Sequence, residues 1–356
     1  MLRRATEGGL ETQVVERVGT SPFALPAPYL LFLGDTVERG YAKTAFGLRD
    51  WAPERCVGEF ALPGARVTTG LPPLSPSEAY DRGARALLIG VATRGGQVPD
   101  NWLPTLSEAL DAGLDIISGM HDRLCDIDIL ANQAGRLGRR LIDVRVPPAD
   151  IPIATGRKRS GQRLLTVGTD CALGKKYTAL AIARGLAARG LDVDFRATGQ
   201  TGIMIAGAGI PIDAVVADFL AGAAELLSPD AAPDHLDVIE GQGSLFHPSY
   251  AAVTLGLLHG SQPDRFVVCH DPKRTHILGL PDFRLPSIEE VIAQTVAAGR
   301  LTNPAIRCCG VSLNTSALSD EDAAQVIAET ARRLGLPAAD PVRGIGLEQL
   351  LDACAG

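Results

Sequence analysis

The residues most able to do chemistry form one stretch, Gly168 to Thr178. An apolar run, residues 164–167, precedes it, and a helical pattern with one apolar face follows it as far as Gly190. A strand, a glycine-flanked loop with a lysine, and then a helix is the layout of a phosphate-binding loop, whose N–H groups and helix N-terminus face the anion. We therefore predict that a phosphate or pyrophosphate binds Gly168, Thr169, Asp170, Cys171, Gly174, Lys175, Lys176, Tyr177 and Thr178.

This loop departs from the usual pattern G-x-x-x-x-G-K-[ST] in two ways. Gly168 lies one residue too early, and Lys176 stands where a Ser or Thr would hold magnesium. Two adjacent lysines at a helix N-terminus suit an anion that binds without metal, whereas phosphoryl transfer usually needs Mg²⁺. Two alternatives stay open: Thr178 could rotate in as a magnesium ligand for ATP, or the stretch is a helix-capping turn with an incidental lysine.

Glu240 ends a predicted strand, residues 236–240, and begins the turn Glu-Gly-Gln-Gly-Ser. A carboxylate at the carboxyl end of a strand is placed for proton transfer or metal binding, and the glycines let a ligand approach the backbone. Strand order often brings such a turn beside the phosphate loop, so we favour a functional role over an exposed turn. Gln242 and Ser244 are then candidate substrate contacts.

A second glycine-rich segment, Thr198 to Gly202, also follows a predicted strand. Arg196 lies just before it, and Gln200 and Thr201 lie within it. Their guanidinium, amide and hydroxyl groups could bind a substrate. A plain glycine-rich turn explains the segment equally well.

A third segment, residues 269–276, follows a strand and gathers acidic, basic and imidazole groups. It contains His270, Lys273 and Arg274, and His247 is a further candidate from the turn after Glu240. Such groups could supply a base and a clamp for carboxylates. For any single histidine, a structural hydrogen bond is the simpler explanation.

Apolar strands alternate with amphipathic helices along most of the chain, which predicts parallel sheets with helices on both faces. Ligands bind at the carboxyl ends of such strands, where the first half carries Lys43 and Arg94. The predicted organisation is a loose leader at residues 1–28, an α/β domain at 29–146, a linker at 147–162 and a second α/β domain at 163–356. The linker contains a basic cluster, residues 157–159, which we expect to be solvated.

The composition limits the function classes. The 356 residues carry a net charge of −7, which argues against a nucleic-acid partner because phosphate backbones require a basic face. Seven cysteines without a C-x-x-C pair indicate reduced thiols in a cytoplasmic protein. We expect neither a secretory signal nor a membrane span, and the apolar composition is compatible with a homo-oligomer.

The motifs together resemble a known family. The Gly-Thr-Asp and Gly-Lys of residues 168–175, with the Glu-Gly-x-Gly turn at 240–243, resemble dethiobiotin synthetase over the second half, although that family has Thr where this chain has Lys176. A closer resemblance covers nearly the whole chain and adds Gly-Gln-Thr-Gly at 199–202 and His-Asp-Pro at 270–272. That family, formerly of unknown function, includes bacterial D-glutamate N-acetyltransferases.

This resemblance implies an α/β fold with a Rossmann-like N-terminal parallel-sheet domain and a P-loop NTPase-like C-terminal domain. It implies transfer of an acetyl group from acetyl-CoA to the amino group of D-glutamate, with the loop holding the pyrophosphate of CoA and with no metal ligand. The alternatives are an ATP- and Mg²⁺-dependent ligase or kinase, and a nucleotide-binding protein without turnover. The candidate bases are Glu240, then His270 and Asp170, and the candidate clamps for a dicarboxylate are Arg196, Lys273, Arg274, Lys43 and Arg94.

Overall fold

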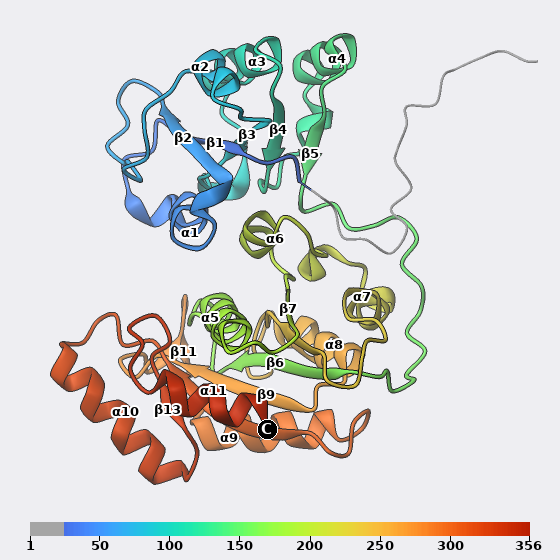
Figure 1. Cartoon of the computed structure of the whole chain (residues 1–356), viewed down its shortest axis with the longest axis vertical. Helices are drawn as coiled ribbons and strands as arrows, with labels where there is room; N and C mark the ends of the chain where they lie inside the picture. Colours follow the sequence, from blue (N-terminus) through green and yellow to red (C-terminus); the bar gives the residue numbers. More distant parts are fainter. Residues whose placement is uncertain (1–24) are drawn as a thin grey trace, which may run out of the picture.

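The computed structural model describes residues 25–356, which form two α/β lobes, each built on one parallel sheet (Figure 1). Residues 1–24 of the predicted leader lie outside the described residues. Leu25 is buried, and its N–H donates to the carbonyl of Gly207 in the second lobe. The chain therefore contacts the second lobe before it enters the first sheet.

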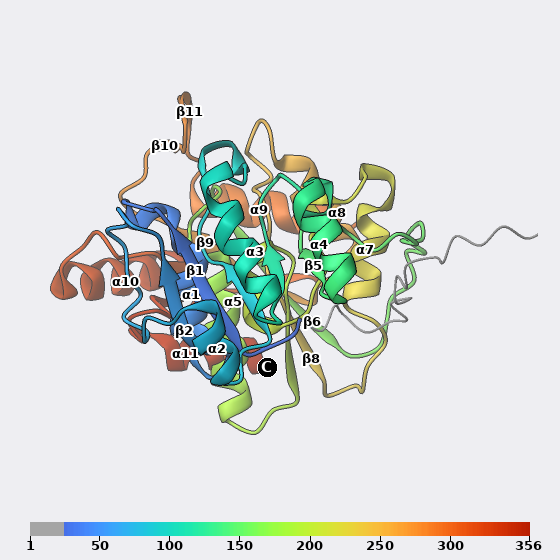
Figure 2. The ribbon, with the colours of Figure 1, turned by 90° about the horizontal axis from the view of Figure 1, so that it is seen from above.

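The first sheet has the strand order β2-β1-β3-β4-β5, and every pair is parallel. Its elements are β1 (Tyr29–Gly34), α1 (Lys43–Trp51), β2 (Cys56–Ala61), α2 (Pro76–Asp81), β3 (Ala86–Ile89), α3 (Leu103–Asp111), β4 (Asp115–Ser118), α4 (Asp128–Leu137) and β5 (Leu141–Asp143). Helices α2, α3 and α4 cover the outer face, and Figure 2 looks down onto α3 and α4. The strand order reverses at β1, so the loop that follows β1 borders the crevice where such sheets bind ligands.

The second sheet has the order β13-β12-β9-β6-β8-β7, again parallel throughout. Its strands are β6 (Gln162–Gly168), β7 (Val193–Arg196), β8 (Leu236–Ile239), β9 (Arg265–His270), β12 (Arg307–Leu313) and β13 (Ala338–Ala339), and β10 (His276–Ile277) and β11 (Leu280–Arg284) form a separate antiparallel hairpin. Its helices are α5 (Lys175–Ala188), α6 (Gln200–Ala206), α7 (Leu220–Leu227), α8 (Ala251–Ser261), α9 (Ile288–Gly299), α10 (Asp320–Leu334) and α11 (Leu347–Ala355). This order places the ends of β8 and β9 on either side of the loop that follows β6.

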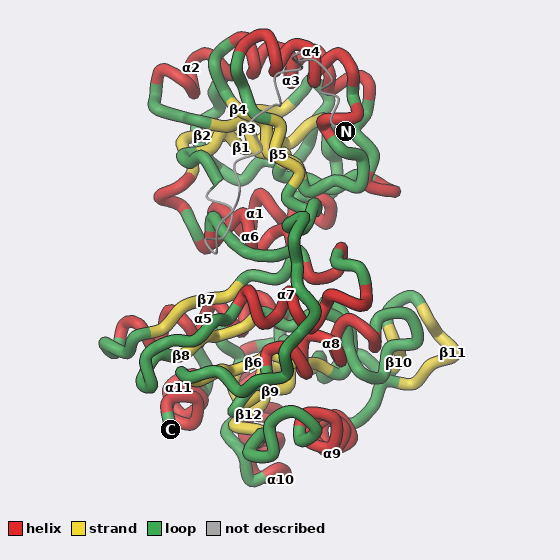
Figure 3. The backbone as a smooth tube through the Cα atoms, turned by 90° about the vertical axis from the view of Figure 1, so that its right-hand side faces the viewer, coloured by secondary structure: helices red, strands yellow, loops and turns green. Residues whose placement is uncertain are grey.

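The two lobes meet through helices that follow strands, so the carboxyl edges of the two sheets face the same interface. Helix α1 of the first lobe packs on α6 of the second, and both lie between the two sheets (Figure 3). The hydroxyls of Thr44 and Thr201 are 2.9 Å apart across this contact. Ile203 and Met204 of α6 belong to the apolar core of the first lobe. The interface is therefore a packed contact and not only a hinge.

The predicted fold class is confirmed: both lobes are parallel α/β structures. Helix α10 is capped by Ser319, whose side chain accepts the N–H of Asp322. Between residues 25 and 356, no helix is long and apolar enough to cross a membrane.

Ser75 caps α2 and forms a reciprocal capping box with Glu78. Two local predictions were wrong. The segment 198–202 is not only a turn, since α6 begins at Gln200. Arg159 of the basic cluster is buried and donates to the carbonyls of Ser228 and Gly260, so this part of the linker is not solvated.

Candidate functional site

The loop between β6 and α5 has the geometry of an anion cradle. Gly174 adopts a φ of 103°, in the left-handed region that favours glycine, and α5 begins at the next residue. The ammonium of Lys175 is buried and donates to the carbonyl of Asp170, 2.7 Å away, so the lysine side chain extends back along the loop. Burial lowers the pKa of Lys175. A bound anion would replace the interactions with water that this ammonium has lost on burial.

Asp170 and Arg274 form an ion pair that ties the loop to the segment after β9. The Arg274 Nη1 is 2.9 Å from Oδ2 of Asp170, whose side chain is fully buried. The same oxygen accepts the N–H of Leu278, and Oδ1 accepts the N–H of Cys171. Arg274 also donates to the carbonyl of Cys171. Both residues hold the loop in shape, and their roles as base and clamp remain predictions.

Thr178 faces away from the cradle. Its hydroxyl lies 2.7 Å from that of Ser312 on β12 and accepts from the thiol of Cys269 on β9. The side chain is buried between α5 and the sheet. In this arrangement, neither position 176 nor position 178 offers a hydroxyl where a P-loop normally binds Mg²⁺.

His270 flanks the loop on the β9 side. Its Nδ1 is 3.1 Å from the hydroxyl of Thr169, the second residue of the loop. Burial lowers the pKa of His270, with the charge of Asp271 opposing the shift, so the neutral ring is favoured near neutral pH. A polar cleft of about 540 Å³ opens beside this histidine, and Arg274 and Arg284 also line it.

Glu240 flanks the loop on the β8 side, as strand order predicted. Its side chain is 4% exposed, and Oε2 accepts the N–H groups of Thr198 and Gly199 at 3.0 and 3.1 Å. Burial raises the pKa of Glu240, and the charge of Lys176 opposes this shift. A Cβ on Gly202 would lie 2.2 Å from Oε2, so only glycine leaves room for the carboxylate beneath α6. The arrangement fixes one basic carboxylate beside a cation.

Lys176 lies between Glu240 and the first lobe. Burial lowers its pKa to about 8; the charge of Glu240 opposes this shift, and that of Lys43 on α1 adds to it. The ammonium also sits 4.5 Å from the ring centroid of Tyr177. The side chain that replaces a magnesium ligand is therefore a cation whose charge changes near physiological pH.

The structure brings several other predicted residues to the same edge of the sheet. Gln242 donates to the hydroxyl of Thr198, and Gln200 and Thr201 form the first turn of α6. The remaining predicted contacts are a buried Ser244, Lys273 in the loop after β9, and Arg94, which begins a short 3-10 helix in the first lobe.

Arg196 lies on β7, and the structure gives it two acidic partners. Its Nε is 2.6 Å from Asp237, and its Nη2 is 2.9 Å from Asp194. A guanidinium held by two carboxylates is not free to bind a third. Its role as a substrate clamp therefore remains a prediction without support from this geometry.

One carboxylate, one thiol and one imidazole near the loop lie close enough together to share a metal ion. Potential ligand atoms of Asp170, Cys171 and His247 lie within 4.8 Å of one another. Both oxygens of Asp170 are already engaged, one of them by Arg274. We therefore attribute the proximity of these groups to the folding of the loop.

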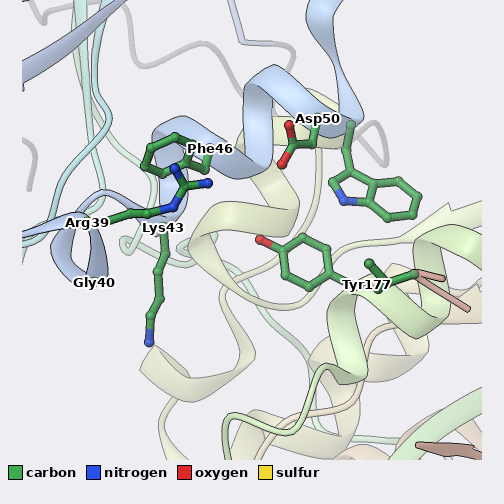
Figure 4. Close-up of a pocket in the computed structure, with 8 residues that line it drawn as sticks. Arg39, Gly40, Lys43, Phe46, Asp50 and Tyr177 are labelled. Atoms are coloured by element: carbon green, nitrogen blue, oxygen red, sulfur yellow. The ribbon is translucent and has the colours of Figure 1, made fainter. Parts of the chain in front are cut away.

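A pocket of about 440 Å³ lies between the lobes, next to the first turn of α5 (Figure 4). The sequence did not single out most of its residues, although the position of Arg39, in the loop after β1, was a usable signal. The pocket is lined by Arg39, Gly40, Lys43, Phe46, Asp50, Trp51, Tyr177 and Val342.

Two segments of the chain match the two domains of one protein family. Residues 152–351 match the "Domain of unknown function (DUF1611_C) P-loop domain", and residues 60–147 match the "Domain of unknown function (DUF1611_N) Rossmann-like domain". The chain belongs to the DUF1611 family. A crystal structure of a DUF1611 family protein from Anabaena variabilis superposes with a TM-score of 0.79 at 33% identity, covering 92% of this chain and 98% of that one.

Two relatives of this chain carry a functional name. The chain is 50% identical to a D-glutamate N-acetyltransferase of Tritonibacter scottomollicae, over 93% of this chain and 99% of the relative. It is 48% identical to a D-glutamate N-acetyltransferase of Pseudoalteromonas sp, over 89% of this chain and 95% of the relative. The predicted resemblance to a two-domain family that includes D-glutamate N-acetyltransferases, with Rossmann-like and P-loop domains, is therefore confirmed.

Proposed function

We propose that this DUF1611 protein transfers the acetyl group of acetyl-CoA to the amino group of D-glutamate. The observation that carries the proposal is the identity of 50% and 48% to two D-glutamate N-acetyltransferases over nearly the full length of all three chains. Both lobes are included in that similarity, so the site between them belongs to the shared part. The positive charge of the phosphate-binding loop supports acetyl-CoA as the donor, because CoA carries an anionic diphosphate.

The phosphate-binding loop would hold the pyrophosphate of the donor. Its backbone N–H groups, the N-terminus of α5 and the ammonium of Lys175 all favour an anion there. Lys176 adds a second positive charge at the position that would otherwise hold a magnesium ligand. An anion bound in this way needs no metal.

Glu240 would act as the general base. The amino group of a free amino acid is protonated at neutral pH and must lose a proton before it attacks. A carboxylate with a raised pKa is a stronger acceptor for that proton than an ordinary one. The nitrogen then attacks the thioester carbonyl, the new C–N bond forms, and the C–S bond breaks. The second proton leaves the nitrogen, and one proton goes to the departing CoA thiolate.

Two positions are open for the acceptor. Glu240 and His270 lie on opposite sides of the loop, because β8 and β9 flank β6. We place the acceptor amine near Glu240, where Gln200, Gln242 and Lys43 offer polar contacts for its carboxylates. His270 is the second candidate for the general base, after Glu240. Its ring is neutral and lies next to Arg274, which favours it over Asp170 as the base.

An ATP- and Mg²⁺-dependent ligase or kinase is the competing function. The positions of Lys176 and Thr178 speak against it, because neither offers a hydroxyl to Mg²⁺ at the loop. The test is to incubate the protein with acetyl-CoA and either D- or L-glutamate in EDTA, and to measure free thiol and N-acetylglutamate by mass spectrometry. We expect equal amounts of thiol and N-acetyl-D-glutamate. A separate incubation contains Mg-ATP in place of EDTA, and its free phosphate is measured. Phosphate release there, without thiol release in the first incubation, would overturn the proposal.

A further inference from the structure

The pocket between the lobes combines an apolar wall with unpaired positive charge. The rings of Trp51 and Tyr177 stack with centroids 5.8 Å apart at 21°, and Val342 also lines the pocket. Opposite them, the guanidinium of Arg39 lies 3.7 Å from the ring centroid of Phe46 (Figure 4). Arg39 is exposed and forms no ion pair within residues 25–356. Apolar ring edges that face a guanidinium without an ion pair suit an aromatic ligand that carries an anionic group.

The pocket adjoins the phosphate-binding loop. Tyr177 is the third residue of α5, and its ring centroid lies 4.5 Å from the ammonium of Lys176, the residue that follows Lys175. A diphosphate bound at the cradle therefore brings the group attached to it to the wall formed by Tyr177. Figure 4 shows the Tyr177 hydroxyl and the Arg39 guanidinium on facing sides of this space, with the Lys43 ammonium extending past them.

We propose that this pocket binds the adenosine 3′-phosphate end of coenzyme A, with Arg39 contacting the 3′-phosphate and the edges of Trp51 and Tyr177 packing against the adenine. The inference rests on the proposed use of acetyl-CoA. It explains why the cradle has a second cationic site next to it, since CoA carries a phosphate on its ribose, apart from the diphosphate, and ATP does not. The pocket thus selects CoA over adenine nucleotides.

The decisive experiment compares CoA with dephospho-CoA, which lacks only the 3′-phosphate. Calorimetry measures the dissociation constants of both ligands for the wild type and for Arg39→Ala, with Arg332→Ala, an exposed arginine of α10, as the matched control. We expect the wild type and the control to bind CoA at least about 10-fold more tightly than dephospho-CoA, the range of a charge-assisted hydrogen bond. Arg39→Ala should lose this preference by weakening CoA binding alone.

The outcomes separate this inference from the proposed function. Equal weakening of both ligands by Arg39→Ala, or no weakening, overturns the inference even if the wild type releases thiol from acetyl-CoA. A higher KM for D-glutamate with an unchanged preference for CoA also overturns it and assigns the pocket to the acceptor. Loss of the CoA preference in Arg39→Ala supports it, even if the wild type binds CoA without transferring acetyl.

Discussion

The guanidinium of Arg274 lies 2.9 Å from the carboxylate of Asp170, and this ion pair joins the two segments that flank the candidate site. Asp170 belongs to the phosphate-binding loop, and Arg274 belongs to the segment between β9 and the β10–β11 hairpin. The carboxylate is fully buried, and this ion pair offsets part of the cost of removing it from water. The pair thus couples the shape of the anion cradle to a segment that is distant in sequence.

Removing one partner of this pair should destabilise the loop. We expect Arg274→Ala to lower the free energy of unfolding by about 3 kcal/mol, because it leaves a buried carboxylate without its cation. Denaturant unfolding measures the loss, and Arg332→Ala serves as the exposed control. An unfolding free energy of Arg274→Ala equal to that of the wild type would contradict this structural role of the pair.

Lys176 should set the alkaline limit of donor binding. Burial lowers its pKa to about 8, so the lysine loses its charge as the pH rises through that value. We expect the KM for acetyl-CoA to increase above about pH 8 in the wild type. Arg keeps its charge in this range, so Lys176→Arg should move the increase to higher pH. An identical pH profile for the two proteins would exclude Lys176 from donor binding.

Glu240 and Gly202 should act together in the acetyl transfer step. Because Glu240 is the proposed base, Glu240→Gln should lower kcat by roughly 10²–10⁴-fold. Gly202→Ala should also lower kcat, because the new Cβ would displace the carboxylate, whereas the dissociation constant for CoA should change little. Gly135→Ala in α4, where a Cβ meets no atom within 4 Å, is the matched control. Full activity of Gly202→Ala would show that the observed position of Glu240 is not required.

His235 should make the stability of the second lobe depend on pH. Burial disfavours its charged form, but the carboxylates of Asp192 and Asp237, 2.9 and 3.1 Å away, outweigh burial and raise its pKa. The stabilisation is therefore complete below about pH 6.5, the unfolded value, and is lost as the pH rises through the folded pKa. The Tm of His235→Gln should fall less with rising pH than that of the wild type. His276→Gln, at an exposed site, should behave as the wild type does.

Local signals in the sequence predicted the phosphate-binding loop and the two strands beside it. An apolar run, a glycine with a lysine, and a helical pattern are all contained within residues 164–190, so no distant contact was needed to recognise them. The position of Glu240 followed from a general rule, that parallel strands end at one edge of the sheet. The order of the strands then placed this residue beside the loop.

The remaining features depend on contacts between segments far apart in the sequence. The short segment Gln200–Ala206 contains a glycine, and this pattern predicts a turn. Packing of Ile203 and Met204 into the first lobe instead stabilises a helix there. The ion pair of Asp170 spans 104 residues. Arg159 is buried because carbonyls from two other segments accept its N–H groups. Residue type and spacing alone carry no information on such partners.

The most direct test of the account is which anion the loop binds. Calorimetric titration of the wild type and of Lys175→Ala should be carried out with acetyl-CoA in EDTA and, separately, with Mg-ATP. We predict that acetyl-CoA binds without metal, and that Lys175→Ala weakens this binding roughly 10- to 100-fold, as expected for loss of a charged hydrogen bond to phosphate. Binding of Mg-ATP but not acetyl-CoA, or an unchanged affinity for acetyl-CoA in Lys175→Ala, would contradict the account.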